Sequence, residues 1–219
     1  MRYNTTGCNN IAFGCQALTN NTYGANNNAQ GYFALRNNTS GTNNVAIGRS
    51  SLNSNTSGSC NVAQGYKALY GNTTGKTNIG IGYNAGWGIT VGQNNIALGS
   101  STLKNSTGNC NIAIGYQTAL NNLAGQENII IGKGAAADGT STDFNQNIII
   151  GTEAGSRIQQ DNQIFIGTSA GKNNTTGDRN IFIGLNAGAT NAISQDNVII
   201  GSDAGASLVG IAGLGDNVI

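Results

Sequence analysis

Short apolar runs recur along the whole chain, and each run follows an Asn or Gln, here called the anchor, and ends at a Gly. One example is Val45-Ala46-Ile47, which lies between the anchor Asn44 and Gly48. Successive closing Gly residues are 17 positions apart in most copies and never depart from that spacing by more than two. Self-similarity at a fixed period is typical of one small unit stacked on copies of itself, so the pattern predicts a repeat architecture. The closing residues are Gly14, Gly31, Gly48, Gly65, Gly82, Gly99, Gly115, Gly132, Gly151, Gly167, Gly184 and Gly201.

The residues of one repeat predict β-structure. Val45-Ala46-Ile47 is short, largely β-branched and bounded by Asn and Gly, which is typical of a strand. A second, weaker strand is expected around Ser51-Leu52, and Asn55-Thr56-Ser57-Gly58 has turn chemistry, with the Gly available for positive φ. Helix is disfavoured because every repeat contains several Gly and Asn residues. We therefore predict an all-β fold, a flattened parallel β-solenoid of about 17 residues per coil.

Strand alternation separates two sets of apolar positions, with Val45 and Ile47 on one face and Ala46 on the other. The middle position is Ala in most of the first half and Ile or Phe in most of the second half. The residue eight after the anchor changes in the opposite sense, from Leu to Gly. This exchange of small for large predicts that the two positions touch in one core. Val45 and Ile47 then face outward, and an apolar outer face predicts cover by another copy of the chain.

Some coils depart from this pattern. In one coil both core positions are Gly, namely Gly80 and Gly86, and Trp87 is expected to fill the gap beside them. Gln30 and Gln64 interrupt the outward apolar set, with Asn28 beside the first. They form either a polar layer that fixes register or binds an ion or water on an axis, or an amide ladder of the kind that stacked strands tolerate.

Charge divides the chain into two parts. Residues 1–126 carry regular Asn-Thr-Thr-Gly turns with six Lys or Arg and no acidic residue, whereas residues 127–219 are less regular, with four Lys or Arg and nine Asp or Glu. A basic and an acidic end would orient a fibre on an anionic cell surface, or the acidic residues only solubilise irregular loops. The pI is near 7.6, and the chain has no basic run, no stretch of 18 apolar residues and no secretory signal. We therefore expect neither nucleic-acid binding nor membrane insertion.

The two chain ends fall inside repeats. Residues 1–7 align with residues 69–75, so the chain opens in the middle of a coil, and it closes at Asn217-Val218-Ile219, inside the next apolar run. Solenoids usually end in atypical polar capping repeats. We expect the chain to be a segment of a longer protein.

Catalytic chemistry has few candidates in this sequence. The chain has no His and no recurring carboxylate pair, so we expect no enzyme activity, cofactor or metal site. Asp138 and Asp143 lie in the longest loop, where they are candidates for receptor contact or, alternatively, for polysaccharide cleavage. Four Tyr residues directly follow a closing Gly and either stack on receptor sugars or form a surface ladder that stiffens the roll. They are Tyr32, Tyr66, Tyr83 and Tyr116.

Cysteines and Asn-Thr-Thr triplets suggest two further kinds of site. Cys8, Cys15, Cys60 and Cys110 form no CxxC pair, which argues against zinc. Cys60 and Cys110 lie three coils apart, or about 14 Å at the strand spacing, too far for a disulfide within one chain; they are small turn residues or form an interchain bond.

The Asn-Thr-Thr triplets match the N-glycosylation sequon but also suit plain turns, and rows of Thr and Asn are also found on ice-binding surfaces. The triplets begin at Asn4, Asn20, Asn38, Asn55, Asn72, Asn105 and Asn174.

The repeat resembles those of bacteriophage tail-fibre proteins. The segment Asn111-Ile112-Ala113-Ile114-Gly115 and the linking Asn72-Thr73-Thr74-Gly75 carry the resemblance, which extends over essentially the whole chain. The repeats are also similar to the YadA-like heads of trimeric autotransporter adhesins, although adhesin heads repeat at a shorter interval. The resemblance implies a left-handed parallel β-roll and a homotrimer whose chains are either intertwined or side by side. It also implies a structural role in a virion attachment device that contacts a host-surface receptor or glycan and other fibre segments. The alternative is a bacterial cell-surface adhesin head that binds host matrix or surface glycans.

Overall fold

The computed structural model describes residues 3–139, 143–190 and 195–206 and confirms an all-β parallel solenoid with about 17 residues per coil. The described residues contain no helix. The chain forms two compact units, Met1–Asn109 and Cys110–Ile219. The change of composition at residue 126 therefore lies within the second unit.

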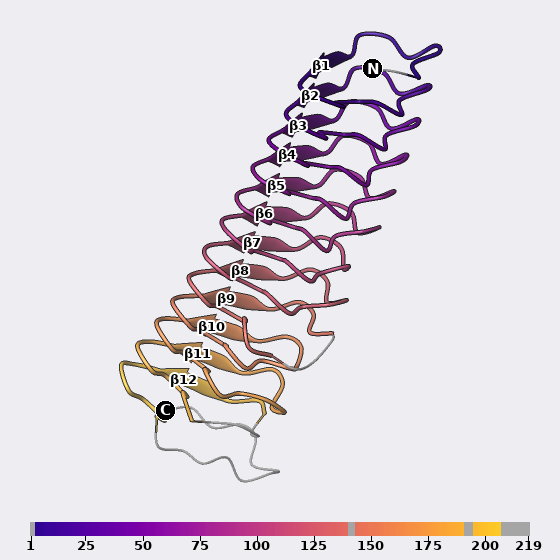
Figure 1. The fold of residues 1–219 in the computed structure, drawn as a ribbon. Helices are drawn as coiled ribbons and strands as arrows, with labels where there is room; N and C mark the ends of the chain where they lie inside the picture. Colours follow the sequence, from indigo (N-terminus) through magenta and orange to yellow (C-terminus); the bar gives the residue numbers. More distant parts are fainter. Residues whose placement is uncertain (1–2, 140–142, 191–194, 207–219) are drawn as a thin grey trace. The chain divides into compact units, whose positions relative to one another are not determined.

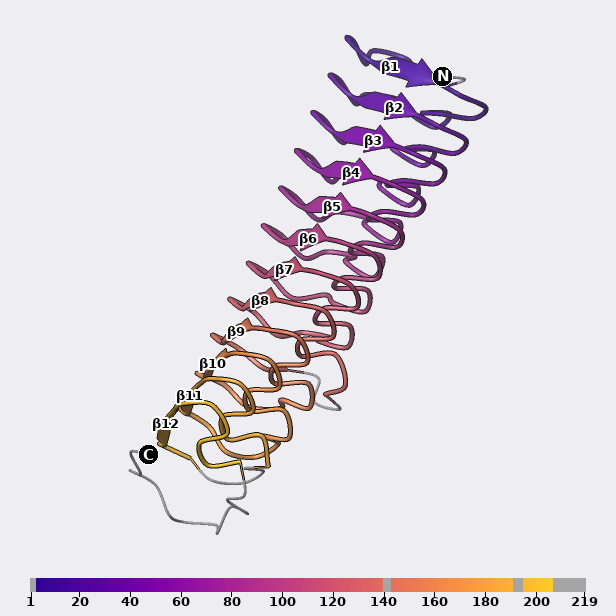
Figure 2. The same cartoon turned by 90° about the vertical axis from the view of Figure 1, so that its left-hand side faces the viewer.

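Each coil contributes one strand of three residues. In the first unit the strands are β1 (Ile11–Phe13), β2 (Asn28–Gln30), β3 (Val45–Ile47), β4 (Val62–Gln64), β5 (Ile79–Ile81) and β6 (Ile96–Leu98). In the second unit they are β7 (Ile112–Ile114), β8 (Ile129–Ile131), β9 (Ile148–Ile150), β10 (Ile164–Ile166), β11 (Ile181–Ile183) and β12 (Val198–Ile200). Within each unit the strands stack in sequence order along one side of the coils (Figures 1 and 2). Equivalent residues pair in parallel register, as Ala46 does with Ala63.

The expected second strand around Ser51-Leu52 is wrong. Residues 49–54 form a turn, because Ser50 and Leu52 have left-handed φ angles of 58° and 47°. An extended strand cannot pass through such residues. The coils remain linked at this place, since the backbone N–H of Leu52 donates to the carbonyl of Ala68 in the next coil at 3.0 Å.

The core lies where the sequence pattern predicts it. Ala46 and Leu52 are both fully buried, whereas Val45 and Ile47 are only half-buried on the other face of the strand. The predicted contact between middle and eighth positions is confirmed, because a Cβ on Gly171 would lie 2.6 Å from the ring of Phe165. These contacts also cross between coils.

In the coil of Gly80 and Gly86, aliphatic side chains fill the space beside the two core Gly residues. A Cβ on Gly86 would meet Leu69 of the preceding coil at 2.7 Å and Ile89 of its own coil at 3.0 Å. Trp87 instead is 38% exposed and stacks on Tyr70. The prediction that Trp87 fills this gap is therefore wrong, and the aliphatic neighbours fill it.

Gly58 and its equivalents serve a different purpose from the one expected. Gly58 has no left-handed φ. A Cβ there would lie 2.4 Å from the carbonyl oxygen of Gly75 in the next coil, so the side chain must be absent for the coils to approach. In the first unit the turn Gly residues approach one another in this way from Gly7 to Gly108. In the second unit the carbonyl of Phe144 takes the place of a Gly carbonyl, 2.2 Å from where a Cβ on Gly125 would lie.

Two buried Asn ladders hold the turns. The amide of Asn44 donates to Asn27 Oδ1 at 3.0 Å and to the Gly58 carbonyl at 2.9 Å, while its own Oδ1 accepts from the backbone N–H of Asn61. Asn55 donates to the same Gly58 carbonyl at 2.9 Å. The anchor Asn is thus part of the interior. The turn carbonyls of Gly24, Gly41, Gly58 and Gly75 each receive two amide donors, which satisfies a buried acceptor.

The polar interruptions of the outer face do not form a ladder. Parallel register places Gln30 between Phe13 and Ile47, so no amide lies directly beside it on a neighbouring strand. Gln30 instead donates to Asn28 Oδ1 of its own strand at 3.0 Å.

Candidate binding groove

Three surface depressions lie at equivalent positions of different coils. The backbone turns after the closing Gly of each coil. A shallow channel, here called the turn groove, runs beside these turns and is bordered in each coil by the residues five, six, nine and ten after the anchor. Two depressions of the turn groove lie in the first unit, with volumes of about 510 and 370 Å³. A third, of about 330 Å³, lies in the second unit.

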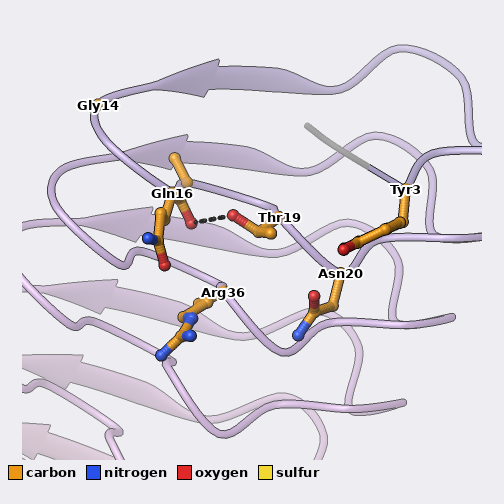
Figure 3. A pocket seen from close by; sticks show the side chains of 7 residues that line it. Tyr3, Gly14, Gln16, Thr19, Asn20 and Arg36 are labelled. Carbon is orange, nitrogen blue, oxygen red and sulfur yellow. Dashed lines mark hydrogen bonds between the residues drawn. The ribbon is translucent and has the colours of Figure 1, made fainter.

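The first depression lies at the start of the first unit and is lined mainly by neutral polar groups. Figure 3 shows Gln16, Thr19 and Asn20 from one coil, with Arg36 contributed by the next. Thr19 Oγ1 donates to the carbonyl of Gln16 at 2.9 Å, and Asn20 donates to Asn37 Oδ1 at 3.0 Å. Its polar groups are therefore partly engaged with one another.

The second depression combines aromatic rings with ammonium groups. Its lining residues are Tyr66, Lys67, Tyr83, Asn84, Trp87, Lys104 and Asn105. The rings of Tyr66 and Tyr83 stack with centroids 5.3 Å apart and an interplanar angle of 11°. Trp87 stacks on Tyr70 at 6.1 Å with an angle of 2°. The 17-residue repeat therefore builds two short aromatic stacks, one on each side of the groove.

Cations lie over these rings and complete the stacks. Lys67 Nζ lies 5.4 Å from the ring centroids of both Tyr66 and Tyr70, so it bridges the two sides of the groove. The guanidinium of Arg49 lies between Tyr32 and Tyr66, at 5.5 and 5.9 Å. Such contacts stabilise cations that have no carboxylate partner.

The four Tyr residues singled out from the sequence behave differently from one another. Tyr66 and Tyr83 form the stacked ladder foreseen as one of two interpretations, and both line the second depression. Tyr32 is 43% exposed and contacts Phe33, with centroids 3.9 Å apart. Tyr116 is 50% exposed and lines the depression of the second unit.

The second unit brings Asp138 and Tyr116 into one depression. Asp138 is exposed and its Oδ2 accepts a hydrogen bond of 2.6 Å from Ser156 Oγ. Lys172 and Glu153 form an ion pair of 2.6 Å in the same place. Asp143 is exposed and precedes the buried Phe144, but it does not line this depression. The structure therefore does not bring Asp138 and Asp143 together in one site.

Acidic residues of the second unit also connect coils. Arg179 Nε donates to Asp196 Oδ1 at 2.6 Å, 17 residues later in the sequence, and Arg179 also pairs with Asp178. The hydrogen bond from Arg179 lowers the pKa of the Asp196 carboxyl, and the same bond raises the pKa of Arg179. Asp196 therefore helps to hold neighbouring coils together.

The sequon residues lie mostly in the interior. Asn38, Asn55, Asn72 and Asn174 are fully buried, and the first three are members of the inner Asn ladder. A glycosyltransferase would have to reach an amide that the fold encloses, so these four positions are turn and ladder residues.

The four Cys residues are exposed, and the structure contains no disulfide between them.

The part of the chain that the structure describes holds no group of three or more His, Cys, Asp or Glu side chains placed to bind a metal ion. It also holds no helix of sufficient length and apolarity to span a bilayer.

Sequence reasoning missed the second side of the turn groove. Tyr70, Trp87 and Lys104 lie nine residues after their anchors and recur at the repeat spacing, so this alignment is the signal that could have found them. Comparison with known proteins adds no assignment: no family model matches the chain, and no curated protein or solved structure matches it.

Proposed function

We propose that the chain is a structural segment of a virion attachment fibre, resembling a phage tail-fibre shaft or receptor-binding head, and that it acts without catalysis. In this proposal three copies pack side by side as left-handed β-rolls. The assembled fibre displays its turn grooves toward a host surface.

One observation carries this proposal, the outward apolar face of the sheet. In β7–β12 every outward position is Ile except Val198, and none of these side chains is buried. Ile129 is 37% exposed, Ile148 36% and Ile200 57%. Contiguous apolar surface of this kind marks an interaction site on a soluble chain.

A second copy of the same chain is the partner that this face fits best. The face repeats once per coil along the strand ladder, so a partner with the same spacing matches it row for row. A copy of this chain has that spacing by construction, and closed symmetric association buries identical faces together. The same repetition gives a rigid scaffold that carries loops and grooves at regular intervals.

The assembly part of the proposal is tested by charge substitution on the outer face. Ile148→Glu should weaken self-association without unfolding the coil, because the side chain is already partly exposed. Leu185→Glu is the matched control, since Leu185 is 48% exposed but lies outside the strand. If both substitutions weaken association equally, or neither does, the sheet face is not the interface.

The attachment part is tested by binding of the labelled chain to a panel of bacterial cells and to immobilised animal matrix proteins. A virion fibre should bind particular bacterial cells, with Ile148→Glu weakening the signal at least about tenfold through loss of avidity. Binding to matrix proteins alone would overturn the fibre proposal in favour of an adhesin head.

A further inference from the structure

We propose that the turn groove between Tyr66 and Asn105 is a binding site for an acidic polysaccharide, a chain of sugars that carries carboxylate groups. This inference deepens the attachment role proposed above by giving the ligand class of one groove. Its test measures ligand binding rather than assembly, so either proposal can fail without the other.

The charge of the first unit favours an anionic ligand. Residues 1–126 contain no Asp or Glu, so the cations of the first unit have no side-chain carboxylate partner there. Lys67 and Lys104 both line the depression, from two different coils, and they are the ammonium groups that a ligand carboxylate would meet. A carboxylate between two ammonium groups gains charge-assisted hydrogen bonds.

The rings provide the apolar part of the site. The ring of Tyr83 is covered by Tyr66 on one face, and the next coil carries Ser100 at the equivalent position, so no third ring follows. Trp87 is likewise covered by Tyr70 and followed by Lys104. Each stack therefore ends at this depression, where Tyr83 is 55% and Trp87 38% exposed. Stacked neighbours hold these rings in place before the ligand arrives, which reduces the entropy cost of binding.

Amide and hydroxyl groups complete the chemistry that a sugar requires. Asn84 and Asn105 line the depression together with the Tyr hydroxyls, so it offers donors and acceptors for sugar hydroxyls as well as cations for carboxylates. Ligand sites are typically concave, with apolar and aromatic walls and a few placed polar groups.

A single-stranded nucleic acid is the competing ligand class, and the geometry favours it less. Such ligands stack successive bases on open ring faces along a continuous positive groove. Here Tyr66 and Tyr83 cover one another, and only two cations line the depression. The depression therefore does not present successive open ring faces along a continuous positive groove.

The test uses the full chain and a matched pair of probes, an oligogalacturonate and the same oligosaccharide with its carboxylates methyl-esterified. Isothermal titration calorimetry at low salt should show binding of the acid form and about tenfold or weaker binding of the ester. Higher ionic strength should weaken the acid form further. Because Trp87 is the only tryptophan, its fluorescence should change on binding.

Variants locate the site. Lys104→Gln should weaken binding about three- to tenfold, with Lys104→Arg restoring much of it, and Trp87→Ala should weaken it about tenfold. Lys76→Gln is the matched control, because Lys76 is exposed outside the depression and its substitution removes the same charge. Circular dichroism verifies that each variant is folded.

Four outcomes would overturn the proposal. They are equal binding of acid and ester, an equal loss for Lys76→Gln and Lys104→Gln, no binding of the acid form at millimolar concentration, and tighter binding of oligothymidylate that the Lys104 and Trp87 variants abolish. The last outcome would assign the groove to nucleic acid.

Discussion

The exchange of core volume between the middle and eighth positions can be reversed in a single coil. Phe165→Ala together with Gly171→Leu would give a second-unit coil the core of a first-unit coil. Phe165 is fully buried and stacks on Phe182 with centroids 5.0 Å apart, so Phe165→Ala alone should cost about 3–5 kcal/mol through the cavity and the lost ring contact.

The second substitution has the opposite defect. Three ring atoms of Phe165 lie 2.6–2.7 Å from where a Cβ on Gly171 would be, so Gly171→Leu alone should cost about 1–3 kcal/mol through overpacking. The φ of Gly171 is 57°, which adds about 1 kcal/mol for a residue with a side chain. Leu52 occupies the equivalent position at φ 47°, so the backbone there does accept Leu.

The double variant should therefore lose much less than the sum of the single losses, with a coupling of about 2–3 kcal/mol. Urea denaturation followed by circular dichroism gives the three values, and the mirror pair Ala46→Phe and Leu52→Gly repeats the test in the first unit. Strictly additive losses in both cycles would refute the conclusion that the two positions share one core.

Three further predictions concern the turns and the ion pairs. Asn44→Ala should lower the free energy of unfolding by about 2–3 kcal/mol, because it leaves the buried backbone N–H of Asn61 without its acceptor and removes one of the two amide donors of the Gly58 carbonyl. A loss below about 1 kcal/mol in urea denaturation would contradict the ladder's role. Gly58→Ala should cost about 1–3 kcal/mol through contact with the next coil, although the φ of Gly58 is ordinary. Gly134→Ala should cost about 1 kcal/mol, because Gly134 has a φ of 65° but its nearest contact is 3.7 Å away. A larger loss of melting temperature for Gly134→Ala than for Gly58→Ala would refute the close-approach argument. Because Arg179 lowers the pKa of Asp196, this carboxylate stabilises the fold above its ordinary pKa and the contribution is lost as the pH falls through the lowered value. Asp196→Asn should therefore flatten the acid side of the stability profile, and an unchanged profile would show that the pair contributes nothing.

The sequence predicted the architecture because the architecture is a consequence of periodicity. A three-residue alternation around Ala46 is enough to separate inside from outside, and volume exchange with Leu52 identifies the core. The second strand was mispredicted because alternation cannot reveal a left-handed φ at a Leu, which the stacked neighbours stabilise. Trp87 was misplaced for a similar reason, since its size suggested a cavity filler and nothing local signals a stack on Tyr70.

The turn groove was only half predictable. Tyr66 and Tyr83 follow a closing Gly and were found as candidates, but their partners on the other side of the groove lie four positions later in each coil. The path of the turn decides which side chains meet across the solenoid surface. This path depends on positive φ angles at residues such as Ser50, which cannot be recognised from the sequence. Asn44 was recognised as the marker of the repeat, yet its burial became clear only when one amide was seen bonded to the coils before and after it.

The central claim is that the outward face of β7–β12 is covered by further copies of the chain. Sedimentation velocity of the purified chain over a wide concentration range measures this directly. We predict a particle with the mass of three 22.3 kDa chains, and dissociation of that particle by Ile148→Glu but not by Leu185→Glu. A stable, soluble monomer of 22.3 kDa at every concentration would contradict the account.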